Sequence, residues 1–68
     1  MTEAEEQALR TALAVLAQEH RDLDAAIAAM TDHGIRDQLQ LTRLKKRKLQ
    51  LRDQIAGIEN ALLPDIIA

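Results

Sequence analysis

Basic side chains gather in residues 43–52, a stretch that contains no acid. Dense positive charge suits the phosphates of a polyanion, and it equally suits carboxylates elsewhere in the same protein. Residues 1–24 offer such carboxylates, because they hold six acids against two arginines. The formal net charge is only −2, which favours neutralisation of one helix by the other. The cations that would reach phosphates in the alternative are Arg43, Lys45, Lys46, Arg47 and Arg52.

Catalytic and metal-binding patterns are missing from the sequence. It has no cysteine, and the spacing of His20 and His33 fits no ordinary zinc site. It also lacks a Ser/His/Asp set and a glycine-rich phosphate loop. We therefore predict a protein that is not an enzyme and that uses no cofactor, metal or small-molecule substrate. Because no aromatic side chain is present to stack on bases, any nucleic-acid binding would be non-specific.

Apolar residues in the first half of the chain recur at alternating spacings of four and three. This pattern predicts an amphipathic helix over about residues 2–31. Thr2 and Glu5 have the spacing of a capping box, which marks its start. The predicted seam consists of Leu9, Leu13, Leu16, His20, Leu23, Ile27 and Met30.

The second half repeats the pattern after a loop at about residues 32–37. Gly34 can close the first helix in the left-handed conformation, and Asp37 can cap the second. The second helix should run over about 38–63, because Pro64 ends it, and an apolar tail follows at 64–68. Its seam consists of Leu41, Leu44, Lys48, Leu51, Ile55, Ile58 and Leu62.

Two such helices joined by a short loop predict an all-α fold, an antiparallel two-helix hairpin of the coiled-coil type in one unit, residues 1–68. A turn near residue 35 would pair positions whose numbers sum to roughly 71. His20 and Lys48 then fall in adjacent layers, with Asp24 one turn away, and we predict a polar cluster of these three residues. We interpret it as fixing register, since catalysis would require a pocket with titratable groups, and we expect none.

A lone hairpin leaves apolar side chains uncovered, which favours association. We expect a homodimer that forms a four-helix bundle, and a larger protein partner is compatible with the same surface. No apolar run approaches the roughly 20 residues of a membrane span, and the acidic start is unlike a signal peptide, so we expect a cytoplasmic protein with no membrane partner. The predicted interface residues are Val15, Leu39, Leu49, Leu63, Ile66 and Ile67.

The segments EHRDLDAAI and LTRLKKRKLQLRDQI together resemble the YdcH-like family of small bacterial proteins, a domain family of unknown function. The resemblance covers about residues 9–60 and implies a helical hairpin or coiled coil without an established activity. Arg52 departs from the usual lysine but keeps the charge, and the LPDIIA ending is similar to alphaproteobacterial members. The matching positions are Leu16, Glu19, His20, Leu23, Asp24, Ile27, Leu44, Lys45, Lys46, Lys48, Leu49, Leu51, Asp53 and Ile55.

Taken together, the residues favour a small, non-catalytic bacterial coiled-coil protein that acts as a protein–protein interaction and oligomerisation module. The alternative is a non-specific nucleic-acid-associated protein that uses the basic face of its second helix.

Overall fold

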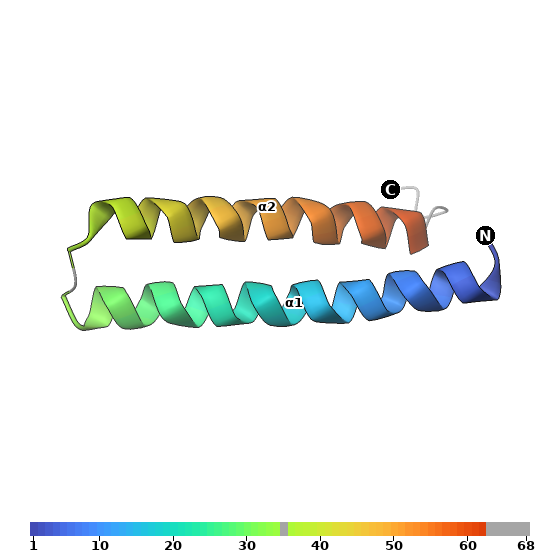
Figure 1. Ribbon diagram of the computed structural model, residues 1–68, viewed down its shortest axis with the longest axis horizontal. Helices are drawn as coiled ribbons and strands as arrows, with labels where there is room; N and C mark the ends of the chain where they lie inside the picture. Colours follow the sequence, from blue (N-terminus) through green and yellow to red (C-terminus); the bar gives the residue numbers. More distant parts are fainter. Residues whose placement is uncertain (35, 63–68) are drawn as a thin grey trace, which may run out of the picture.

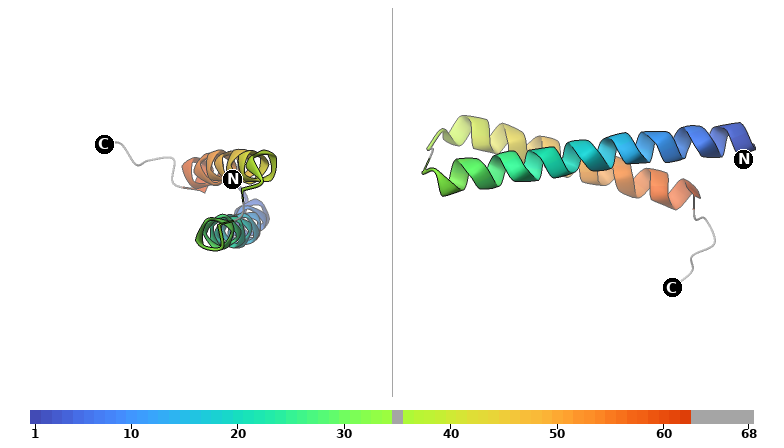
Figure 2. Two further views of the ribbon diagram at one scale, coloured as in Figure 1. Left: turned by 90° about the vertical axis from the view of Figure 1, so that its left-hand side faces the viewer. Right: turned by 90° about the horizontal axis from the view of Figure 1, so that it is seen from below.

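The computed structural model describes residues 1–34 and 36–62, which form two long helices. Helix α1 spans Glu3–Asp32 and helix α2 spans Gln38–Leu62. The two helices run antiparallel and lie side by side, joined by a short connection at one end (Figures 1 and 2). This arrangement confirms the predicted all-α helical hairpin. Leu63 and the tail at 64–68 lie outside the described residues.

The ends of both helices follow from the residues that flank them. The side-chain oxygen of Thr2 accepts a hydrogen bond from the Glu5 backbone N–H at 3.1 Å, which satisfies a donor in the first turn of α1. Gly34 adopts a φ of +69°, a left-handed conformation that side-chain-bearing residues rarely adopt, and so lets the chain leave α1. The Asp37 carboxylate accepts from the Gln40 N–H at 3.0 Å and begins α2.

The predicted seams face each other along the hairpin, but they form a thin core. Among the described residues only Met30, at 9% exposed, and Leu51, at 0%, are buried. The other seam residues are half-buried, because each helix covers its partner from one side only. The molecule is correspondingly narrow, with extents of 47 × 25 × 16 Å. Neither α1 nor α2 is long and apolar enough to cross a membrane.

Candidate functional site

Two ion pairs join α1 to α2, one on each side of the apolar seam. Lys48 Nζ lies 2.6 Å from Asp24 Oδ1, and Arg47 Nη2 lies 3.2 Å from Glu19 Oε2. Glu19 and Asp24 are five residues apart, about 140° around the helix, so their carboxylates leave α1 in different directions. Both pairs match a base of residues 43–52 with an acid of residues 1–24, as mutual neutralisation of the two helices requires.

The predicted polar cluster is brought together through Lys48 and Asp24. The hydrogen bond from Lys48, followed by its positive charge, lowers the pKa of the Asp24 carboxyl below its usual value of 3.8. The charge of His20 contributes in the same direction, although within the described residues His20 donates no hydrogen bond to Asp24. The Asp24 side chain is largely exposed, so the pair contributes little to the free energy of unfolding.

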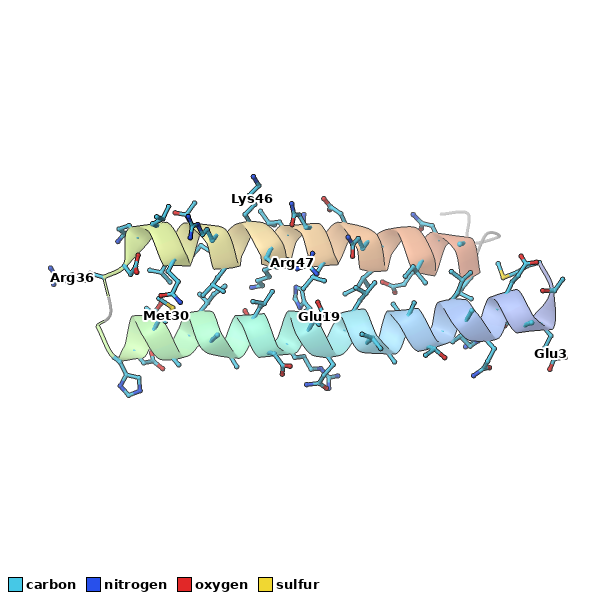
Figure 3. All side chains as sticks on the ribbon, in the orientation of Figure 1. Glu3, Glu19, Met30, Arg36, Lys46 and Arg47 are labelled. Atoms are coloured by element: carbon cyan, nitrogen blue, oxygen red, sulfur yellow. The ribbon has the colours of Figure 1, made fainter. Side chains whose placement is uncertain are left out.

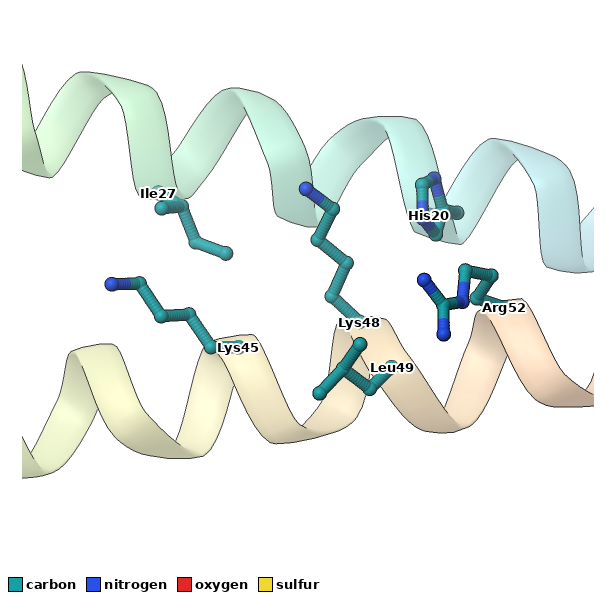
Figure 4. Close-up of a pocket in the computed structure, with 6 residues that line it drawn as sticks. All are labelled: His20, Ile27, Lys45, Lys48, Leu49 and Arg52. Carbon is teal, nitrogen blue, oxygen red and sulfur yellow. The ribbon is translucent and has the colours of Figure 1, made fainter.

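A groove of about 340 Å³ opens between the helices on the Lys48–Asp24 side of the seam. The expectation that no hollow with titratable groups would form is therefore wrong, because cationic side chains and an imidazole surround this one. Ile27 and Leu49 supply its apolar part (Figure 4). The full lining is His20, Ile27, Lys45, Lys48, Leu49 and Arg52.

The cations of residues 43–52 are distributed around α2 and do not share one face. Lys45 and Arg52 line the groove, whereas Arg47 pairs with Glu19 on the opposite side of the seam. Lys46 points away from α1 into solvent (Figure 3). Arg43 is exposed as well. A single extended polyanion could thus contact only some of these side chains at once.

Residues 13–59 match the family described as "Protein of unknown function (DUF465)". The chain belongs to the DUF465 family. The match includes most of both helices and the whole groove lining. No curated protein and no solved structure matches the chain.

Among the described residues, the predicted interface positions of this DUF465 protein do not form one continuous patch. Val15, Leu39 and Leu49 are all exposed, at 54%, 62% and 51%. Leu49 lies in the groove, whereas Val15 lies one turn before Glu19 and so shares the opposite side of the hairpin. The remaining predicted interface residues, Leu63, Ile66 and Ile67, lie outside the described residues.

The groove itself was not identified from the sequence, although a signal for it was present. Lys45, Leu49 and Arg52 are spaced by four and three, which places them on one stripe of α2. This stripe lies beside the seam position Lys48. An exposed apolar residue flanked by two cations on such a stripe indicates a second surface of α2, next to the seam, that combines apolar and positively charged side chains.

Proposed function

We propose that this DUF465 protein is a non-catalytic interaction and oligomerisation module that pairs with a second copy to form a four-helix bundle. The observation that carries the proposal is the thinness of the core. With only Met30 and Leu51 buried among the described residues, one hairpin leaves most of its seam partly in water. A chain of this size usually gains the missing burial by association. We also propose the finer assignment to YdcH-like bacterial proteins and a cytoplasmic location.

The surface that best suits a second copy is the Val15 face, defined as Ala8, Ala12, Val15 and Glu19 of α1 with Arg47 of α2. Its alanines permit close approach of another helix, and Val15 offers apolar area that one hairpin leaves exposed. Its charges are of both signs, with Glu19 on α1 and Arg47 on α2. A two-fold arrangement that lays α1 of one copy over α2 of the other would bring opposite charges together.

Sedimentation across a range of protein concentrations tests this proposal. We expect a dimer whose thermal unfolding midpoint rises with concentration over about 1 µM to 1 mM, because association stabilises the folded state by mass action. Val15→Glu should shift the equilibrium to monomer. Ala25→Glu is the matched control, since it adds the same charge to an exposed position on the back of α1. A wild-type chain that stays monomeric throughout the range would refute the proposal.

A further inference from the structure

We propose that the groove is a docking site for an acidic amphipathic helix of a different protein. This inference rests on the proposed role as an interaction module and names the chemistry of a partner other than a second copy. Apolar and cationic side chains together line the groove, which runs along the junction of α1 and α2 (Figure 4). The partner that fits must offer apolar and anionic side chains on the same face.

The apolar part of the groove is uncovered surface with a defined position. Leu49 is 51% exposed at the middle of α2, and Ile27 of α1, which lines the same groove, is only half-buried. Leaving such area in water is unfavourable, and an apolar side chain laid between the two would remove it from water. An open groove between two helices receives the apolar face of a third helix, in the manner of other helix-in-groove contacts.

The charges that flank Leu49 specify the sign and the spacing of the charges that the partner must carry. Lys45 precedes Leu49 by four residues and Arg52 follows it by three, so the two cations are seven residues, or about 10 Å, apart along α2. Within the described residues neither cation forms an ion pair, whereas Lys48 is already held by Asp24. Two carboxylates seven residues apart on a partner helix, with leucines between them, would match this stripe.

A second copy is a poor occupant of the groove. A two-fold contact through this side would bring Lys45 and Arg52 close to the same residues of the other chain, and like charges in contact are unfavourable. A head-to-tail contact between this side and the Val15 face would leave a groove unfilled at one end of a growing chain and a Val15 face uncovered at the other. Nucleic acid is also disfavoured, because it offers no apolar side chain for Ile27 and Leu49, and the protein has no aromatic residue to stack on bases.

The test uses a synthetic helical peptide of about 20 residues, long enough to form a stable helix on binding. It carries glutamates at positions i and i+7, leucines at i+3 and i+4, and one tryptophan. Binding is followed by the fluorescence of this tryptophan. Because the protein contains no tryptophan, tyrosine or phenylalanine, the fluorescence comes from the peptide alone. A control peptide of identical composition has its glutamates moved to the opposite face of the helix.

Three charge reversals in the full chain locate the site. Lys45→Glu and Arg52→Glu should each weaken binding of the patterned peptide by about tenfold or more, since an attraction becomes a repulsion. Lys46→Glu is the matched control, because it reverses the charge next to Lys45 at a side chain that points away from α1 (Figure 3). It should change the dissociation constant by less than about twofold, as is usual for a charge outside the contact. Circular dichroism of each variant verifies that it remains helical.

The proposal is overturned if Lys46→Glu weakens binding as much as Lys45→Glu, or if both peptides bind equally well. It is also overturned if a short DNA duplex binds the groove variants less well than wild type while the patterned peptide does not bind at all. Val15→Glu separates this site from the dimer, because it should shift the equilibrium to monomer and leave peptide binding intact. Conversely, the wild-type chain could be monomeric and bind the patterned peptide, with binding weakened by Lys45→Glu. That result would refute the proposed dimer and support the proposed docking site in the groove.

Discussion

Leu51 and Leu49 provide a direct test of where the stability of the hairpin resides. They lie two residues apart in the middle of α2, yet Leu51 is 0% exposed and Leu49 is 51% exposed. Truncating a fully buried leucine to alanine costs about 2–5 kcal/mol. Leu49→Ala removes a side chain that is only half covered and gains slightly in helix propensity, so its cost should stay below about 1 kcal/mol. The two substitutions are chemically identical and differ only in burial.

Urea unfolding followed by circular dichroism at 222 nm measures both losses. A chain of this length has a total stability of the order of 3–10 kcal/mol. With a slope of about 1 kcal/mol per molar urea, Leu51→Ala should lower the midpoint by about 2 M or more. Leu49→Ala should lower it by less than about 1 M on the same basis. The measurement is made at the lowest workable protein concentration, so that monomer predominates. Equal losses for the two variants there would refute the assignment of the core to the seam between α1 and α2.

Gly34→Ala should destabilise the fold by about 1–2 kcal/mol, because the backbone φ at this position is +69°. Gly57→Ala should stabilise the fold by up to about 1 kcal/mol, because a Cβ at this helical position meets nothing within 4 Å. Thermal unfolding midpoints that shift in the same direction for both variants would contradict this. Since the pKa of Asp24 is lowered in the folded state, its ion pair stabilises the hairpin above pH 3.8 and this contribution is lost as the pH falls through the lower folded value. Lys48→Gln should therefore reduce the acid dependence of the urea midpoint, and an unchanged dependence would exclude the pair as its source. Asp37→Ala removes the cap of α2 and should cost about 0.5–2 kcal/mol in urea unfolding, whereas no loss would show that water replaces the cap.

Much of the hairpin could be predicted because its determinants are local. Apolar spacings of three and four define a helical face, and Gly34 was expected in the left-handed conformation that it adopts. The cap at Thr2 was likewise predictable, since it requires only a hydroxyl at the right distance in sequence. The contact between Asp24 and Lys48 followed from the register alone.

The groove and the depth of burial were not predictable in the same way. Periodicity states which side of a helix faces its partner, but it does not state how many atoms the partner supplies to cover it. Met30 and Leu51 are buried while equivalent leucines of the same seams are half-buried. The groove depends on how the long side chains of Lys45 and Arg52 lie beside shorter ones, and exposed lysine and arginine side chains have many rotamers.

The antiparallel seam has a kinetic consequence, because the contacts differ greatly in sequence separation. Met30 and Leu41, next to the connection, are joined by a short segment, whereas Leu9 and Leu62 are joined by almost the whole chain. Closing the short loop first costs less conformational entropy, so the contacts between the helices should form in order from the connection outward. Destabilising substitutions near Met30 should then slow folding in stopped-flow experiments, whereas those near Leu9 should mainly accelerate unfolding. The open end, where α1 begins and α2 ends, would separate first and most often, and would present both seams to solvent while the connection stays closed.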